Sequence, residues 1–340
     1  MSELQERLLF VIGSPRSGST LLERMLSSHS MIAGGPEPHI ITPLAHLGYY
    51  DTVQAAPYDH LRAVDAIRGF VAELPNGEAD YLDALRAYTD VLYGRTLAKS
   101  GKERLLDKTP AYALVLPFLS KLYPRAKYVV LTRHPAAIFC SFAESFFEGD
   151  FEAANRFNPI LDRYVPAIAR FLRERPVPIH HVRYEDLVAD PEARMREIFE
   201  FLGVPFEADA IEYGKHERVQ KGLGDPTGVG KHTRPNTESI EKWARQLAGD
   251  EAHYRFVRGL TDRLDPADLA TWGFDKRTLY AAIDEGRVPG MAPRKKKLGD
   301  KLDRHTLERW LLLVLRRNIH RNAFGRLVTK VRFVCDVLLR

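Results

Sequence analysis

A short segment near the N-terminus has the composition and spacing of a phosphate-binding loop. The apolar segment 8–12 is followed directly by Gly13, Ser14, Pro15, Arg16, Ser17, Gly18, Ser19 and Thr20. Backbone N–H groups at the beginning of a helix point at a bound anion, and the helix dipole favours negative charge there. The two glycines and Thr20 match the spacing of the P-loop, G-x-x-x-x-G-K-[ST]. We therefore predict that this loop binds a phosphate group and is not an ordinary strand–turn–helix junction.

One position departs from the P-loop motif. Ser19 stands where nucleoside triphosphatases carry the lysine that reaches the β- and γ-phosphates. Arg16 supplies a positive charge at an earlier position of the same loop. The loop therefore indicates a phosphate ligand but disfavours hydrolysis of ATP.

Apolar segments must position this loop and three further polar loops. Segments with the composition of buried strands occur at 8–12, 104–106, 128–131 and 179–182, with a weaker one at 31–33, and helical patterns such as 81–98 and 111–122 lie between them. This alternation predicts an α/β fold, a P-loop NTPase-like parallel sheet flanked by helices. Ligands bind at the carboxyl ends of such strands. The loops expected there are 13–20, 107–110, 133–135 and 183–186.

Composition places the chain among globular proteins of a reducing compartment. It has 340 residues, of which 45% are hydrophobic and 28% charged. Its two cysteines, Cys140 and Cys335, are too few for a disulfide framework or a zinc site. The N-terminus lacks a signal-peptide pattern, and the apolar run 310–315 is too short to span a bilayer. We therefore expect a cytoplasmic protein.

Positive charge is concentrated in the basic tail, residues 291–340. The tail holds 14 Lys and Arg residues against 4 Asp and Glu residues, whereas the other 290 residues have a net charge of −5. We therefore expect no nucleic-acid partner. Apolar residues recur in the tail at helical spacing, with basic residues between them. Three alternatives stay open: a helix pair packed on the domain, a helix peripheral to a membrane surface, and a docking face for an acidic carrier protein.

Three ordered blocks of the chain resemble sulfotransferases that use 3′-phosphoadenosine 5′-phosphosulfate (PAPS). The segment 14–22 resembles their 5′-phosphosulfate loop, and 128–135 with Ser141 resembles their 3′-phosphate element. The segment 183–204 resembles their third block, which begins RYEDL. The arginine in the loop and the segments 34–39 and 107–110 are similar to the bacterial and tyrosylprotein branch, including sulfotransferase domains of bacterial polyketide assembly lines.

The resemblance implies a binding site for PAPS and its product 3′,5′-ADP. The 5′-phosphate would be bound by Arg16 and by the N–H groups of Ser17, Gly18, Ser19 and Thr20. Arg16 would also be catalytic, because it would stabilise the charge that grows on this phosphate as it leaves. The 3′-phosphate would be bound by Arg133 and Ser141, with Tyr184 close to the adenosine. The long loop 214–236 offers two further candidates, Lys221 and Arg234, of which Arg234 is favoured. Because PAPS has no γ-phosphate, neither the P-loop lysine nor a metal ion is required.

The resemblance also implies transfer of a sulfuryl group to a hydroxyl of a small-molecule, lipid or carrier-bound acceptor, by in-line displacement. Glu37 is the expected general base and His39 its helper, although the sequence does not separate these roles. Lys108 would neutralise the transferred oxygens. The expected sulfotransferase domain is 1–290, with a helical insertion at about 40–105. Two alternatives remain: a non-catalytic nucleotide-binding module with a docking tail, and an atypical P-loop kinase, which Ser19 disfavours.

Two further groups of residues are assigned from their types alone. Several aromatic residues fit either an apolar acceptor pocket or the core: Tyr49, Tyr50, Phe146, Phe147 and Phe151. Other residues are interpreted as structural, namely His29, His134, His180, His181 and Trp243. No spacing in the chain predicts a metal site.

Overall fold

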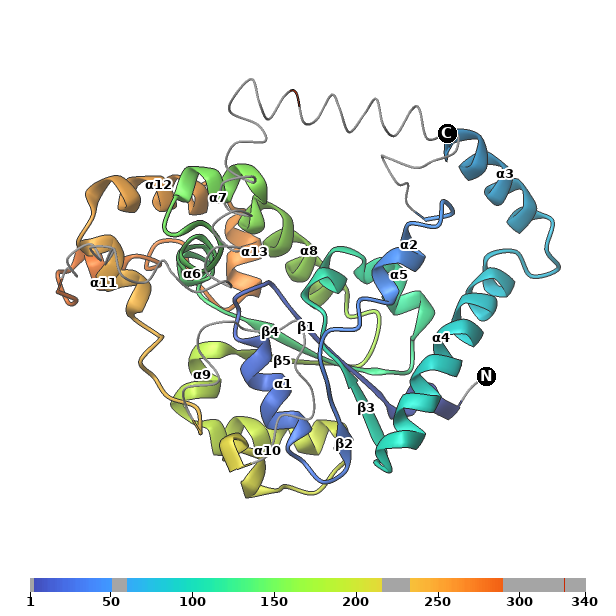
Figure 1. The fold of residues 1–340 in the computed structure, drawn as a ribbon. Coiled ribbons are helices and arrows are strands. Elements are labelled where there is room, and N and C mark those ends of the chain that lie inside the picture. Colours follow the sequence, from blue (N-terminus) through green and yellow to red (C-terminus); the bar gives the residue numbers. More distant parts are fainter. Residues whose placement is uncertain (1–2, 51–59, 216–232, 290–326, 328–340) are drawn as a thin grey trace.

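A parallel sheet of five strands lies at the centre of the protein. The computed structural model describes residues 3–50, 60–215, 233–289 and 327. Within these residues the strand order is β2-β3-β1-β4-β5 (Figure 1). The strands are β1 (Leu8–Gly13), β2 (Ile32–Ala33), β3 (Arg104–Asp107), β4 (Lys127–Thr132) and β5 (Ile179–Arg183). Each of the five predicted segments therefore forms a strand. The predicted phosphate-binding loop, residues 13–20 (the phosphate loop), follows the central strand β1.

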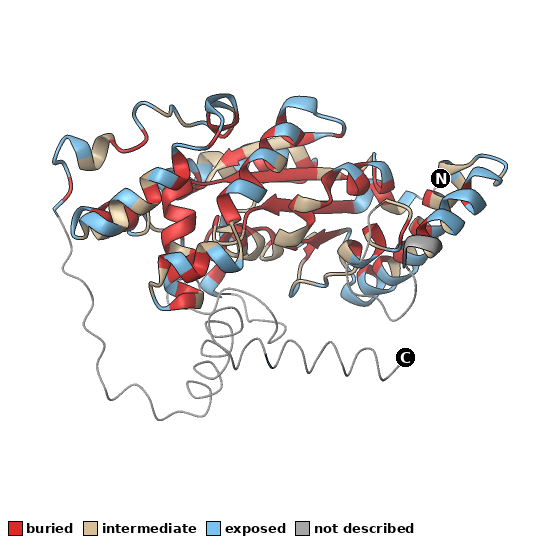
Figure 2. Ribbon diagram, turned by 90° about the horizontal axis from the view of Figure 1, so that it is seen from above, coloured by how far each residue is buried: buried red, intermediate tan, exposed pale blue. Residues whose placement is uncertain are grey.

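The central strand β1 is buried on both faces, as expected for a parallel sheet covered by helices. Its side chains alternate between two separate cores. Leu8, Phe10 and Ile12 belong to one core, whereas Leu9 and Val11 belong to the other. Figure 2 shows the buried strands between layers of helices whose outer faces are exposed.

Helices cover both faces of the sheet. One face packs against α1 (Ser19–Ser27), α9 (Tyr184–Ala189) and α10 (Pro191–Leu202). The other face packs against the 3-10 helix η2 (Pro110–Leu114), α5 (Leu116–Leu122), α6 (Pro135–Phe147) and α8 (Ile160–Glu174). The helix predicted at 111–122 is thus divided into η2 and α5. Pro117 explains the division, because proline has no N–H and is tolerated only in the first turn of a helix.

The remaining elements lie around this three-layer centre (Figure 1). Between β2 and β3 the chain forms α2 (Ile41–Ala45), α3 (His60–Ala72) and α4 (Glu78–Ser100). The other helices are η1 (Glu3–Arg7), α7 (Phe151–Phe157), η3 (Ala208–Ala210), η4 (Tyr213–Lys215), α11 (Lys242–Ala248), α12 (Glu251–Thr261), α13 (Pro266–Thr271) and α14 (Ala281–Asp284). None of the described helices has the length and apolar composition needed to cross a membrane.

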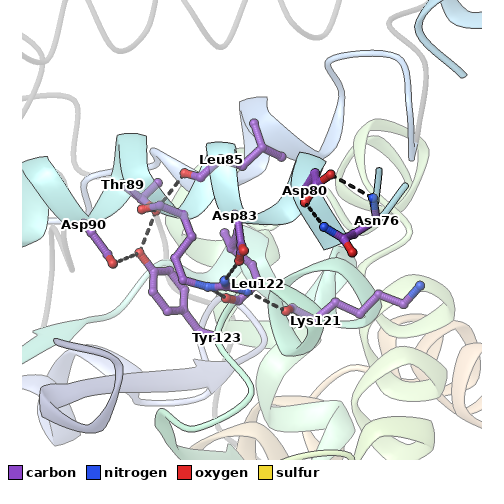
Figure 3. Close-up of polar contacts among 10 residues, drawn as sticks. Asn76, Asp80, Asp83, Leu85, Thr89, Asp90, Lys121, Leu122 and Tyr123 are labelled. Carbon is purple, nitrogen blue, oxygen red and sulfur yellow. Dashed lines mark hydrogen bonds and ion pairs between the residues drawn. The ribbon is translucent and has the colours of Figure 1, made fainter. Parts of the chain in front are cut away.

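Polar contacts fix the long helix α4 against the end of α5 (Figure 3). The Tyr123 hydroxyl lies 2.6 Å from Thr89 Oγ1 and donates to Asp90 Oδ1 at 2.9 Å. Arg86 Nε donates to the carbonyl of Leu122 at 2.7 Å, which satisfies a C-terminal carbonyl of α5. These contacts set the position of α4, whose next turns reach the carboxyl end of β3.

Candidate functional site

The phosphate loop turns sharply between β1 and α1, and two glycines permit the turn. A Cβ on Gly13 would lie 2.7 Å from Ser17 Oγ. Gly18 has a φ of +95°, and a Cβ there would lie 2.4 Å from the ring of Tyr184. Arg16 adopts a φ of +69°, in the left-handed region that non-glycine residues rarely occupy. The predicted motif therefore forms a tight loop that only glycine allows at position 18.

The loop presents several hydrogen-bond donors at the beginning of α1. The N–H of Ser17 donates to the Ser14 carbonyl at 3.1 Å, so this member of the expected phosphate-binding set is engaged within the loop. The N–H groups of Gly18, Ser19 and Thr20 donate to no backbone carbonyl within the described part of the chain. The Ser17 hydroxyl is buried and likewise has no hydrogen-bond partner there. Such donors suit an anion bound at the helix N-terminus.

Four residues predicted to bind the donor lie together beside this loop and form the first cluster of the site. Arg16 Nε donates to Ser141 Oγ at 3.1 Å. Arg133 Nη1 donates to the carbonyl of Arg16 at 3.0 Å, and the Arg133 guanidinium lies over the Tyr184 ring, 4.2 Å from its centroid. Arg133, Ser141 and Tyr184 come from the loops and helices that follow β4 and β5. The structure therefore brings two guanidinium groups and two hydroxyl-bearing residues to one side of the loop.

The element that carries Arg133 is held rigidly by its neighbours. The N–H of His134 donates to Glu185 Oε1 at 2.9 Å. The His134 ring stacks on Trp243 with centroids 4.0 Å apart, and its Nε2 lies 2.9 Å from the Leu279 carbonyl. Burial lowers the pKa of His134 to about 3, so the ring is neutral at physiological pH. The structural interpretation of His134 and Trp243 is therefore confirmed, and Glu185 is a supporting residue that the sequence did not single out.

The other histidines interpreted as structural are also packed into the fold. His29 is fully buried, and its Nε2 lies 2.8 Å from the Pro205 carbonyl. His181 Nε2 lies 2.8 Å from Thr132 Oγ1, and burial lowers the pKa of His181 to about 4. Burial also lowers the pKa of His180, whose ring packs near Phe201. None of these contacts places His29, His180 or His181 beside the phosphate loop.

Three of the predicted catalytic residues, Glu37, His39 and Lys108, form a second cluster on the side of the loop toward β3 and β2, whereas the fourth, Arg16, lies in the first cluster. Lys108 Nζ donates to Glu37 Oε1 at 2.5 Å and to Thr20 Oγ1 at 3.4 Å. His39 Nε2 lies 3.3 Å from Glu37 Oε2. Lys108 has a side chain only 2% exposed, whereas that of His39 is 43% exposed. Glu37 thus stands between a buried ammonium group and an imidazole that faces solvent.

Asp107 lies behind this second cluster, and in the described part of the chain the ion-pair partner of Lys108 is Glu37 and not Asp107. The carboxylate of Asp107 accepts hydrogen bonds from Tyr93, Tyr112 and Thr109. Burial raises its pKa to about 6. The sequence places Tyr112 close to Asp107, but Tyr93 comes from α4 and carried no local signal.

Other candidate residues lie outside the two clusters. Arg234 has a side chain 63% exposed, and its Nη1 lies 3.5 Å from Glu212 Oε1. The segment that carries it does reach the donor side, because Arg133 Nη2 donates to the Ser239 carbonyl at 3.0 Å. Lys221 and, apart from Leu327, the basic tail lie outside the described residues.

The aromatic residues divide between core and site. Phe147 and Phe151 are buried in the core, and Tyr49 and Tyr50 pack on Tyr81. Of these five aromatic residues, Phe146 has a contact with the phosphate loop, with its ring centroid 5.9 Å from Arg16 Cζ. The core interpretation therefore holds for Phe147 and Phe151.

The fold and the two clusters together indicate a class of protein. A parallel α/β sheet with two arginines beside the loop 13–20 and an ion-paired carboxylate toward β3 suits an enzyme that transfers a group from an anionic donor. The sequence model described as the Sulfotransferase family matches residues 9–208. Since this is more than half of the chain, the protein belongs to the sulfotransferase family and is a sulfotransferase.

Comparisons with individual proteins agree with this assignment. Over 330 residues the chain is 26% identical to nodulation protein NoeE of Sinorhizobium fredii (strain NBRC 101917 / NGR234), covering 89% of this chain and 73% of NoeE. It is 25% identical over 262 residues to protein-tyrosine sulfotransferase 2 of Gallus gallus, covering 72% of this chain and 64% of that enzyme. The sulfotransferase domain from the curacin biosynthetic pathway matches with a TM-score of 0.50 at 24% identity, covering 76% of this chain and 98% of that domain. The last likeness concerns the fold, and the predicted α/β fold is confirmed.

Proposed function

We propose that this sulfotransferase takes its sulfuryl group from PAPS and transfers it to a hydroxyl group. The observation that carries the proposal is the meeting of Arg16, Arg133 and Ser141 at the phosphate loop. PAPS has phosphate groups at both its 5′ and 3′ positions, and two guanidinium groups beside one helix N-terminus suit such a ligand. The buried Ser17 hydroxyl and the N–H groups of α1 supply further donors at the same place.

Each residue of the first cluster has a proposed role in holding the donor. Arg16 and the N–H groups of Gly18, Ser19 and Thr20 would bind the 5′-phosphate, on which negative charge grows as it leaves. Arg133 would exchange its contacts with two carbonyls for the 3′-phosphate, together with Ser141. The Tyr184 ring, already packed on Gly18 and Arg133, would lie beside the adenosine. Arg234 and Lys221 are proposed as a further wall of the nucleotide site.

The second cluster supplies the acid–base and electrostatic chemistry. When bound, PAPS supplies the sulfuryl group, and this chain's residues act on the acceptor and on the developing charge. Glu37 would accept the proton of the acceptor hydroxyl as that oxygen bonds to sulfur and the bond between sulfur and the phosphate oxygen breaks. Lys108 would neutralise the sulfuryl oxygens, and His39 would hold Glu37 through its second oxygen. Glu37 is favoured over His39 as the base because its carboxylate contacts both Lys108 and His39.

The acceptor is proposed to be a hydroxyl group on a small molecule, a lipid or a carrier-bound chain. A hydroxyl group fits this role because the Glu37 carboxylate would take up the proton that the hydroxyl loses. The net charge of the basic tail suits attachment to an anionic membrane surface or an acidic carrier protein of the cytoplasm. No metal ion is required, since the positive charge comes from Arg16, Arg133 and Lys108.

Transfer of radioactive sulfur tests this function. The protein is incubated with ³⁵S-labelled PAPS and a panel of phenols, sugars, lipids and carrier-bound hydroxyacyl chains, with a chelator present. We expect labelled product and equimolar 3′,5′-ADP with at least one acceptor class. Labelling that requires ATP or a divalent metal ion would contradict the proposal.

A further inference from the structure

A buried carboxylate lies behind the ion pair of Lys108 and Glu37, and the proposed reaction does not use it. Asp107 is the last residue of β3 and is only 4% exposed. Because successive side chains of a strand point to opposite faces, Asp107 enters one core, whereas Lys108 reaches Thr20 at the beginning of α1. One dipeptide therefore places an ammonium group in the site and a carboxylate directly behind it.

Three hydroxyl groups satisfy this carboxylate. Tyr93 and Tyr112 donate to its Oδ2 at 2.6 and 3.1 Å, and Thr109 donates to its Oδ1 at 3.1 Å. The Tyr112 hydroxyl in turn accepts a hydrogen bond from the N–H of Ile41 at 3.3 Å. The chain of hydrogen bonds thus runs from a backbone N–H through Tyr112 to Asp107.

This chain of hydrogen bonds ends close to the proposed base. Ile41 is the first residue of α2 and follows His39 by two positions. The segment 37–41 is therefore tied at two points to the residues that follow β3, through Glu37 on Lys108 and through Ile41 on Tyr112 of η2. Between these points His39 has a φ of +54°, a strained conformation that persists only where surrounding contacts enforce it.

We propose that Asp107 and Tyr112 are positioning residues, which hold the segment 37–41 in register with Lys108 and the phosphate loop. The inference rests on the proposed roles of Glu37 and Lys108. An apolar residue would fill the space of Asp107 without the cost of burying a carboxylate, so packing alone does not account for it. Positioning does, because displacement of a reacting group by about 1 Å can lower a rate by about 100-fold.

A matched pair of variants tests the proposal. Tyr112→Phe and Tyr93→Phe each remove one hydroxyl from the same oxygen of Asp107, but only Tyr112→Phe breaks the link to Ile41. With labelled PAPS and the best acceptor of the panel, we expect Tyr112→Phe to lower kcat by about tenfold and to leave the KM for PAPS unchanged. Tyr93→Phe should keep kcat within about twofold at a similar loss of thermal stability. Equal kcat values for the two variants would overturn the proposal.

Amide hydrogen exchange provides a readout that does not depend on turnover. In peptides that contain Ile41, exchange should become faster in Tyr112→Phe and stay at the wild-type rate in Tyr93→Phe. Unchanged exchange in Tyr112→Phe would overturn the positioning role even if PAPS is the donor. If the wild-type protein transfers no sulfuryl group from PAPS, the proposed function fails, and the exchange result still decides whether the link fixes this segment.

Discussion

Replacing Arg133 by alanine separates the two phosphate sites of the proposed donor. Arg133 donates hydrogen bonds of 3.0 Å to the carbonyls of Arg16 and Ser239. When the nucleotide binds, the same guanidinium would face the 3′-phosphate. Hydrogen bonds to charged groups contribute about 1.5–3 kcal/mol, and 1.4 kcal/mol corresponds to a factor of about ten in affinity. We therefore expect Arg133→Ala to weaken binding of 3′,5′-ADP by about 10- to 100-fold.

Isothermal titration with two nucleotides makes this prediction specific. 5′-AMP lacks only the 3′-phosphate, so its affinity should stay within about twofold in Arg133→Ala. Arg86→Ala serves as the control, because Arg86 also binds a backbone carbonyl but lies between α4 and α5. It should leave both affinities unchanged. If Arg133→Ala weakens 5′-AMP and 3′,5′-ADP equally, the assignment of the 3′-phosphate site is refuted.

Three further predictions concern the base, the loop and the buried carboxylate. At saturating donor, Glu37→Gln should lower kcat by about 100-fold or more and leave the binding of 3′,5′-ADP unchanged. His39→Ala should lower kcat by less than about tenfold. Full activity in Glu37→Gln would exclude Glu37 as the base. Gly18→Ala should abolish detectable nucleotide binding in titrations, because its Cβ would meet Tyr184 at 2.4 Å, whereas Gly259→Ala, with nothing within 4 Å, should bind normally. Because burial raises the pKa of Asp107 from 3.8 to about 6, the folded state holds a proton that the unfolded chain releases. The free energy of unfolding should therefore fall by up to about 3 kcal/mol as the pH rises from about 4 to about 6. Urea unfolding should show this contribution in the wild type and not in Asp107→Asn; identical pH dependence in both would contradict the burial argument.

The parts of the site that the sequence predicted are encoded locally. Gly13 and Gly18 constrain a single turn, and Arg133 follows directly on a strand, so strand-end positions alone bring them to one edge of the sheet. Glu37 and His39 are also close in the sequence, and His39 Nε2 lies 3.3 Å from Glu37 Oε2.

The parts that the sequence missed depend on tertiary packing. Tyr93 reaches Asp107 only because α4 is held against α5 by contacts of Arg86 and Tyr123. No local pattern indicates such a contact across separate elements. The contact between Arg234 and Glu212 is of the same kind, because η3 and the following turn bring Glu212 close.

We propose above that the phosphate loop and Arg133 bind a nucleotide with a 3′-phosphate and no γ-phosphate. Isothermal titration of the wild-type protein without Mg²⁺ tests this binding preference. We predict that 3′,5′-ADP binds more tightly than ATP by about tenfold or more, a difference of at least about 1.4 kcal/mol. Tighter binding of ATP, or binding of 3′,5′-ADP that is no tighter than that of 5′-AMP, would contradict it.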